Sequence, residues 1–305
     1  MYCSFGVSYF CALFGKSRQA YYEQIKPAND KGLTASVVLH LVREIRRDLP
    51  RCGTDKLYFM MADQLRAMEI KMGRDALYDL LAQHGMLIRS RRRKPRTTNS
   101  NHRYHKYPNL IRNMMLTEAG QLWVSDITYI CLSSGSYAYL SIITDAYSHK
   151  IVGYKLHPTL HSQGAIDALA MAAKDVKRKE KLIHHSDRGT QYCCGDYVKM
   201  ITDLGIGLSM TEKGDPYENA IAERVNGILK IEFGLYERFE SFEKASQATD
   251  AAICKYNTLR PHMSCDMLTP VKAHQQTGLL RKHWKIKDYG KSPKQAPVPD
   301  GLSTA

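Results

Sequence analysis

The chain has 305 residues, and its 44 Lys and Arg against 30 Asp and Glu give a formal charge of +14 at pH 7. This length can supply two or three domains with full-size cores, and a hydrophobic fraction of 44% excludes a disordered chain. No apolar run reaches the roughly 18 to 20 residues of a membrane span. The first residues of the chain lack the basic segment with which a signal peptide begins. The positive charge points to a polyanionic partner, with nucleic acid as the first candidate.

The charge is distributed unevenly along the chain. Residues 1–100 carry 18 basic against 9 acidic groups, and residues 251–305 carry 9 against 3. Residues 201–250 reverse the balance, with 5 basic against 10 acidic groups. An acidic block in a basic protein is either a solvated helix face or a set of carboxylates that hold metal.

The eight cysteines form no CxxC pair, which favours reduced thiols in a cytosolic protein. The doublets His184-His185 and Cys193-Cys194 could suggest zinc. Adjacent side chains on a strand point to opposite faces, however, so each doublet offers only one ligand easily. We do not expect a zinc site there.

Residues 1–88 are predicted to form a helical, helix-turn-helix-like DNA-binding region. Apolar residues recur at helical spacing in 36–48, 55–68 and 74–84, and a short polar break at 71–73 precedes the last segment. Three short helices with a tight break are typical of a helix-turn-helix. The same pattern also occurs in proteins that never bind DNA.

A dense basic run opens the predicted linker, residues 89–118. The run consists of Arg89, Arg91, Arg92, Arg93, Lys94 and Arg96. It can be a solvated linker or a segment that lies along phosphates, where each neutralised phosphate releases counterions, and both can hold at once.

From Leu122 onward the sequence becomes rich in β-branched and aromatic residues. Strands are predicted at 122–132, 137–147, 150–157, 181–185 and 206–210, with helices at 162–177, at 196–204 and from 220. This order predicts an α/β fold with a mixed sheet flanked by helices.

Three carboxylates stand out in this region. Asp126 lies in the middle of the first predicted strand, where a carboxylate costs desolvation unless it is paired or bound to metal. Asp187 ends a short strand, a position that commonly faces a ligand crevice in α/β sheets. Glu223 lies on the long helix, 35 residues separate it from Asp187, and Lys230 follows two turns later on the same helix face.

Phosphodiester chemistry with two divalent ions, roughly 4 Å apart, needs several converging carboxylates. Mg²⁺ prefers hard oxygen ligands, and a nearby Lys can contact a phosphate. Three separated carboxylates are weak as a bare pattern in a chain with 30 acids, so their sequence context carries the interpretation.

That context resembles a known family. The segments 123–130, 185–192 and 219–230 are similar to DDE-type transposases of bacterial insertion sequences, in particular the OrfB subfamily, whose integrase catalytic core belongs to the retroviral-integrase superfamily. The segment 256–262 and Thr269-Pro270 extend the resemblance, which covers about 120–275.

The resemblance implies that Asp126, Asp187 and Glu223 are catalytic and bind Mg²⁺ or Mn²⁺, as two ions, and that Lys230 contacts DNA. It also implies a ribonuclease-H-like fold for a catalytic core at 119–278, before a basic tail at 279–305. The implied reaction is cleavage of the element ends, followed by attack of the freed 3′-hydroxyl on target DNA.

The implied partners are DNA, both the element terminal repeats and the target, and further copies of the chain; no membrane is expected. The implied location is the bacterial cytoplasm, at the nucleoid. Because no leucine-heptad stretch follows Met1, an upstream helix-turn-helix partner polypeptide is a further expectation. Two alternatives stay open: a ribonuclease-H-like nuclease without strand transfer, and a catalytically decayed DNA-binding regulator.

Other acids are alternatives to the three. Asp145, near the end of the second strand, could face the same crevice or cap a turn. Glu218 and Glu232 do not share the face of Glu223. A solvated acidic face is the interpretation of Glu237, Glu240 and Glu243.

Four further positions carry histidine or arginine. His184 and His185 could assist the site, although strand alternation sends one of them into the core. The segment 260–262, Arg-Pro-His, is interpreted either as a contact to DNA or a partner subunit or as a structural turn.

Overall fold

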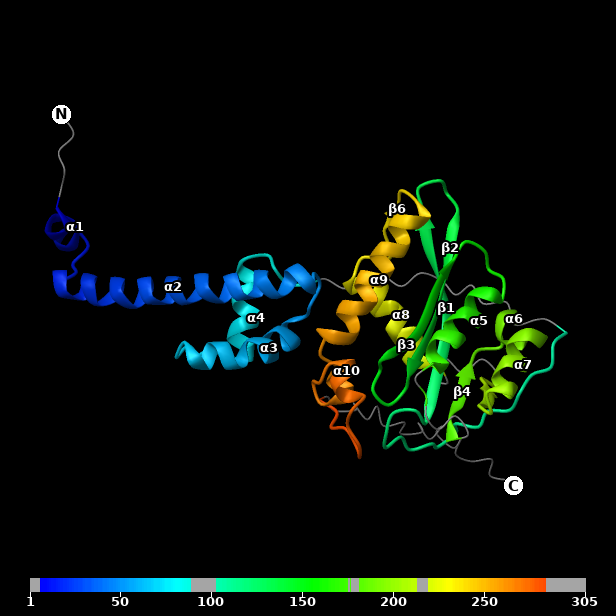
Figure 1. Ribbon diagram of the computed structural model, residues 1–305. Coiled ribbons are helices and arrows are strands. Elements are labelled where there is room, and N and C mark those ends of the chain that lie inside the picture. The colour runs from blue at the N-terminus through cyan, green and yellow to red at the C-terminus, as the bar shows by residue number, and fades with distance from the viewer. Residues whose placement is uncertain (1–5, 89–102, 175, 177–180, 213–218, 284–305) are drawn as a thin grey trace, which may run out of the picture.

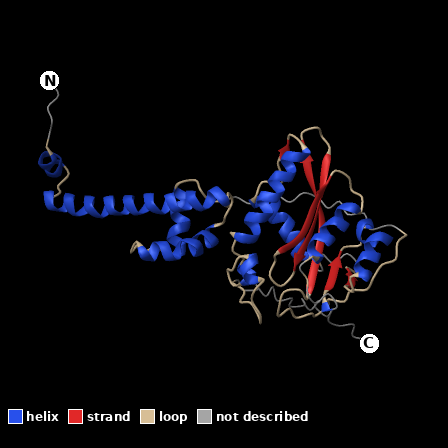
Figure 2. Cartoon of the chain, viewed as in Figure 1, coloured by secondary structure: helices blue, strands red, loops and turns tan. Residues whose placement is uncertain are grey.

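A computed structural model describes residues 6–88, 103–174, 176, 181–212 and 219–283. Figures 1 and 2 show a helical part, in which a short helix precedes a long one, followed by a second part in which helices flank a sheet. Within the described residues, every helix is too short or too polar to cross a membrane.

The long helix of the helical part, the second in chain order, extends well beyond the predicted segment 36–48. The elements are α1 (Val7–Leu13), α2 (Arg18–Asp48), α3 (Thr54–Ala67) and α4 (Arg74–Gln83). Helix α2 begins early because the Ser17 side chain accepts a 2.9 Å hydrogen bond from the Ala20 N–H and caps it. The apolar stripe behind the shorter prediction covers only the end of α2 that packs on α3 and α4.

The helices α2, α3 and α4 enclose a small hydrophobic core. Its fully buried side chains are Val38, Val42, Leu57, Met61, Leu77 and Leu81. Arg46 closes one end, since its guanidinium donates to the Met86 carbonyl at 2.8 Å and to the Cys52 carbonyl at 3.1 Å. We call the part of the chain formed by the C-terminal half of α2, α3 and α4 the helical module. DNA binding by this module stays a prediction.

The sheet has the order β3-β2-β1-β4-β5, and β6 pairs with the far end of β1. The strands are β1 (Leu122–Leu132), β2 (Tyr137–Asp145), β3 (Ile151–His157), β4 (Ile183–Ser186), β5 (Gly207–Met210) and β6 (Arg238–Phe239). The first three are antiparallel neighbours, whereas β4 and β5 run parallel to β1. The predicted α/β fold with a mixed sheet is therefore confirmed.

Helices cover both faces of the sheet (Figure 1). They include α5 (Gln163–Ala173), α7 (Gly195–Asp203), α8 (Ala220–Glu232) and α9 (Phe242–Thr258). Side chains alternate along β1, so Trp123 packs with α5 and α7 while Ile130 packs with α8 and α9. Helix α5 approaches β3 most closely at Gly153, where a Cβ atom would collide with the Ala168 carbonyl.

The chain after α8 is attached to the sheet by hydrogen bonds from the C-terminal end of α9. Tyr256 of α9 donates through its hydroxyl to the His149 carbonyl at 2.9 Å. The Asn257 amide accepts from the Ile151 N–H and donates to the Ile151 carbonyl, both at 3.0 Å. The short elements η2 (Met263–Cys265) and α10 (Pro270–Ala273) follow. These contacts fix α9 against β3, the outer strand in the order above.

Candidate active site

Asp126 lies in the middle of β1, on the sheet face that α8 covers. Its Oδ2 accepts a 2.7 Å hydrogen bond from the side-chain amide of Asn226 on α8. Its Oδ1 accepts from the N–H of Ile127 at 2.9 Å. Both oxygens of this carboxylate therefore have a hydrogen-bond donor, and one donor comes from the helix that also carries Glu223.

Asp187 follows β4 directly, as predicted. Ser186, the last residue of β4, pairs in parallel with Ser125 of β1. The residues that follow these two in sequence, Asp187 and Asp126, therefore lie side by side. The Asp187 Oδ1 accepts from the Gly189 N–H at 3.0 Å. A Cβ atom on residue 189 would lie only 3.0 Å from the same oxygen, so glycine leaves room for this tight turn.

Helix α8 carries Glu223 in its first turn and Lys230 in its last. Asn226 lies between them at helical spacing, which places all three on one face. Since Asn226 reaches Asp126, this face is the one toward the centre of β1. The start of α8 is held by Asn219, whose side-chain amide donates to the Ser125 carbonyl at 3.0 Å.

The three carboxylates influence one another electrostatically. Burial and then the negative charges of Asp187 and, more weakly, Glu223 together raise the pKa of Asp126 to about 7, against the hydrogen bonds from Asn226 and Ile127. Burial and then Tyr197, Asp126 and Asp187 raise the pKa of the Tyr192 phenol in the same way. The structure thus brings Asp187 and Glu223 within electrostatic range of Asp126.

No three His, Cys, Asp or Glu side chains of the described residues lie close enough together to hold a metal ion. The three carboxylates nevertheless fit a hard divalent cation, since all donors are oxygens and the charges of Asp187 and Glu223 both act on Asp126. Metal binding by this set remains a proposal.

The histidine doublet is part of the sheet interior. Both His184 and His185 are fully buried. The His184 Nε2 lies 2.6 Å from the Ser125 hydroxyl and 2.9 Å from the Tyr197 hydroxyl. The His185 Nδ1 lies 2.8 Å from the Ser209 hydroxyl. The prediction that alternation buries only one of them is wrong, because helices or loops cover both faces at β4.

Asp145 has a structural role rather than a place beside Asp126. Its Oδ2 accepts from the Gly120 N–H at 2.8 Å, and its Oδ1 accepts from the Ser148 N–H at 2.9 Å and hydroxyl at 2.7 Å. Burial alone would raise the pKa of Asp145, but these bonds and the His274 ring, 3.8 Å away, keep it below its ordinary value. The turn-capping alternative is the correct one.

Arg260 and Glu232 form a buried pair. The guanidinium donates to both Glu232 carboxylate oxygens, at 2.8 and 2.7 Å, and Arg260 is only 2% exposed. The interpretation of 260–262 as a contact to DNA is therefore wrong, and Glu232 lies off the Glu223 face as expected. The acids Glu237, Glu240 and Glu243 are exposed, in agreement with a solvated acidic face.

Some predicted residues lie outside the described part of the chain. They are Glu218 and the whole basic run of Arg89, Arg91, Arg92, Arg93, Lys94 and Arg96. Their DNA contacts stay a prediction, as does that of Lys230, which is described and half-buried.

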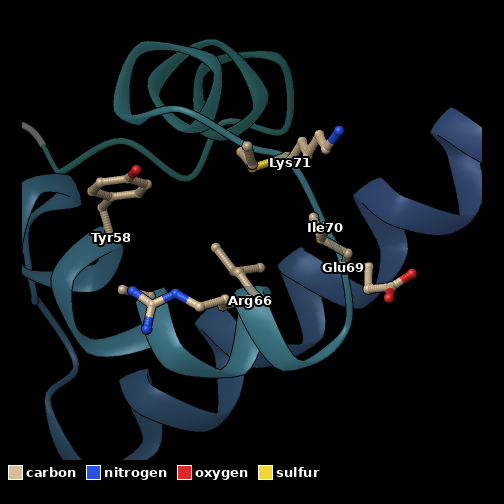
Figure 3. Close-up of a pocket in the computed structure, with 8 residues that line it drawn as sticks. Tyr58, Arg66, Glu69, Ile70 and Lys71 are labelled. Atoms are coloured by element: carbon tan, nitrogen blue, oxygen red, sulfur yellow. The ribbon is translucent and has the colours of Figure 1, made fainter.

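A pocket of about 670 Å³ lies in the helical module, lined by α3 and the segment that joins it to α4 (Figure 3). Tyr58 and Arg66 lie on its α3 side, whereas Lys71 comes from the connecting segment. None of the three carboxylates of the candidate site lines it. The pocket is a groove of the three-helix packing, separate from the residues that carry the candidate chemistry.

Asn226 is the site residue that the sequence interpretation missed. Its signal was its spacing, three residues after Glu223 and four before Lys230, on the helix face already singled out. An amide has no charge to attract notice in a search for metal ligands, so only its contact with Asp126 identifies it.

Two family models, both described as the integrase core domain, match the chain over residues 117–216 and 204–270. Together with the sheet order, they confirm the predicted ribonuclease-H-like fold and define the chain as an integrase-core protein. An uncharacterized 31 kDa protein of insertion element IS600 from Shigella sonnei is 33% identical over 273 residues, which make up 87% of this chain and 98% of that protein.

Transposase InsF for insertion sequence IS3A from Escherichia coli (strain K12) is 31% identical over 226 residues, 73% of this chain and 77% of that protein. The chain belongs to the insertion-sequence transposases of the retroviral integrase superfamily.

Solved structures show more distant likeness. The HTLV-2 integrase catalytic core domain in complex with magnesium (trimeric form) matches with a TM-score of 0.40 and 18% identity, covering 52% of this chain and 97% of that one. A simian T-cell lymphotropic virus intasome chain matches with a TM-score of 0.44 and 18% identity, over 82% and 75%. At this distance neither structure identifies functional residues here.

Proposed function

We propose that this chain is a metal-dependent DNA transposase in which Asp126, Asp187 and Glu223 form the catalytic centre. It cleaves the ends of an insertion element and joins the freed 3′-hydroxyl to target DNA. The reaction uses Mg²⁺ or Mn²⁺, with two ions bound. Membership of the transposase family supports the class of reaction, and the carboxylates supply the ligands.

The observation that carries this proposal is the environment of Asp126. Its carboxylate accepts a hydrogen bond from Asn226 of α8. Burial, together with the charges of Asp187 and Glu223, raises its pKa to about 7. Acids whose like charges act on a buried carboxylate are costly in a structural role. A divalent cation among them would compensate the cost.

Each residue has a distinct task in this proposal. Asp126 and Asp187 would hold the cation from adjacent strands, and Glu223 would close the set from α8. Bound there, the cation supplies charge stabilisation at the phosphate and activation of the attacking oxygen. Lys230 contacts a DNA phosphate as a point charge, two turns along the same helix face from Glu223. No covalent protein nucleophile takes part.

The wider partners follow from the same proposal. The helical module and the basic run bind DNA, including the element terminal repeats, and the chain acts as a homo-oligomer on two element ends. An upstream helix-turn-helix polypeptide assists end recognition. The chain works where its DNA is, at the nucleoid in the bacterial cytoplasm.

The test is an assay with labelled element-end DNA and Mg²⁺ that scores both cleaved and joined products. We expect Asp187→Asn to abolish both, because it removes a charged ligand and leaves the shape of the side chain unchanged. Asp203→Asn is the matched control, since this exposed aspartate lies at the end of α7, and it should behave like the wild type.

Two results would contradict the proposal in different ways. If the wild type and Asp187→Asn were equally inactive with all partners supplied, the chain would be a DNA-binding regulator. If cleavage occurred without joined product under the same conditions, it would be a nuclease without strand transfer.

A further inference from the structure

The C-terminal end of α8 forms a buried contact with the helical module. The Lys56 ammonium of α3 lies 3.6 Å from the Glu232 Oε1. The side chains of Lys56 and Glu232 are only 14% and 18% exposed. Glu232 is the last residue of α8, so the helix that begins beside Glu223 ends at the module.

Arg260, just after α9, completes the cluster. It donates to both Glu232 oxygens, and its remaining terminal nitrogen lies 3.0 Å from the His262 Nε2. Burial lowers the pKa of Lys56, and Arg260 lowers it further, against the charge of Glu232. One carboxylate thus balances two buried cations that come from different parts of the chain.

Apolar packing and a second ion pair join the same two parts. Phe233, the residue after α8, contacts both the core beneath α8 and α9 and the core of the helical module. The Lys255 ammonium of α9 lies 3.0 Å from the Asp48 Oδ1 at the end of α2. This second pair is more exposed, so the buried cluster is the stronger constraint.

We propose that the cluster of Lys56, Glu232 and Arg260 docks the helical module on the catalytic core, and so sets the distance between DNA on the module and the carboxylates. The second half of this statement rests on the proposed function. Buried ion pairs are poor sources of stability but specify geometry well, because their charges must meet. Lys56 is a positioning residue in this arrangement.

The variant Lys56→Met tests the docking, because it removes the one charge that the helical module contributes to the cluster and leaves the Arg260–Glu232 pair in place. Lys71→Met is the matched control at an exposed lysine of the same module. Lys56→Arg retains the charge and should restore wild-type behaviour. Circular dichroism and thermal unfolding verify that each full-length variant is folded.

Small-angle X-ray scattering of the DNA-free chain reports the docking directly. We expect a larger radius of gyration for Lys56→Met than for the wild type, Lys71→Met and Lys56→Arg. An unchanged scattering profile for Lys56→Met would overturn the proposal.

Cleavage of element-end DNA reports the consequence. We expect Lys56→Met to cleave at least tenfold more slowly or at shifted positions, while its affinity for the same DNA stays within twofold of the wild type. If Lys56→Met had a larger radius of gyration but cleaved DNA at the wild-type rate and positions, the link between docking and catalysis would be overturned. If the wild type itself cleaves no DNA, the proposed function fails, and the scattering comparison still decides the docking.

Discussion

At the scale of single residues, the site depends on how each carboxylate is held. Asp126 and Asp187 could be singled out from sequence because a charged residue inside or directly after an apolar strand is costly and conspicuous. Asp145 shares that appearance, yet it accepts hydrogen bonds from Gly120 and Ser148 instead. Sequence cannot separate these cases, since the separating donors come from residues that only the fold brings near. The same holds for Asn226.

Replacing Asn226 by Ala should lower the cleavage rate roughly 10- to 100-fold and raise the Mg²⁺ concentration needed for half-maximal rate, as is typical when a group that orients a metal ligand is removed. The reason is that Asp126 then lacks the donor that fixes its Oδ2. Cleavage measured across a Mg²⁺ series checks this, with Gln247→Ala on the exposed side of α9 as control. An unchanged Mg²⁺ dependence would show that Asn226 does not orient Asp126.

The pKa of Asp126, raised to about 7, predicts a pH-dependent stability of the metal-free chain. A raised pKa means that the folded state favours the protonated acid, so this stabilisation is complete below about pH 4 and is lost as the pH rises to about 7. Asp126→Asn should therefore be more stable than the wild type at pH 8, by on the order of 2–4 kcal/mol, with a difference that shrinks toward pH 4.

Thermal unfolding in the presence of a chelator measures this difference. Asp203→Asn serves as the control, and it should follow the wild type at every pH. An Asp126→Asn curve parallel to that of the wild type from pH 4 to 8 would contradict the raised pKa.

At the scale of elements, the strands β1 to β5 and the helices α5, α7 and α8 could be predicted because their apolar periodicity is strong. For helix α2 the predicted segment is too short, since the sequence of the first half of the helix lacks an apolar stripe. Helix α9 does bury one face at helical spacing, formed by Ala245, Thr249, Ala252, Ile253 and Tyr256, whereas the elements after it, η2 and α10, are too short to show a period.

The contact of α5 with β3 should be sensitive to one methyl group. Gly153→Ala places a Cβ atom against the Ala168 carbonyl and Ala172, so we expect the unfolding free energy to fall by roughly 1–3 kcal/mol, as in other overpacked cores. At Gly207, in β5, the nearest atom would lie at an ordinary 3.5 Å. Chemical denaturation should find Gly207→Ala close to the wild type; equal decreases for both variants would contradict close packing at Gly153.

At the scale of the whole molecule, the net charge of +14 does not show where individual charged residues lie or what they contact. The acids of the proposed site lie on the sheet and at the start of α8, whereas Glu232 at the other end of α8 meets Lys56 of the helical module. The net charge alone predicted a nucleic-acid partner. Neither the pairing across the two parts nor the burial of Arg260 could be read from sequence, because the partners lie far apart along the chain.

The basic run predicts a salt effect on DNA binding. Replacing Arg91, Arg92 and Arg93 by Ala should weaken DNA binding and reduce the slope of log affinity against log salt by about 0.9 for each phosphate that these arginines neutralise. Titrations of labelled DNA at several salt concentrations measure the slope. Replacing the exposed lysines Lys174, Lys181 and Lys199 by Ala removes the same charge elsewhere, and a variant slope equal to that of this control would make the run a plain linker.

The central claim is that Asp126, Asp187 and Glu223 together hold a divalent cation. Anomalous diffraction at the manganese edge, from crystals of the full chain with element-end DNA and Mn²⁺, tests it most directly. We expect anomalous peaks within about 2–2.5 Å of carboxylate oxygens of these three residues, the range for hard cations on oxygen. Peaks confined to other residues, or none at a Mn²⁺ concentration that supports cleavage, would contradict it.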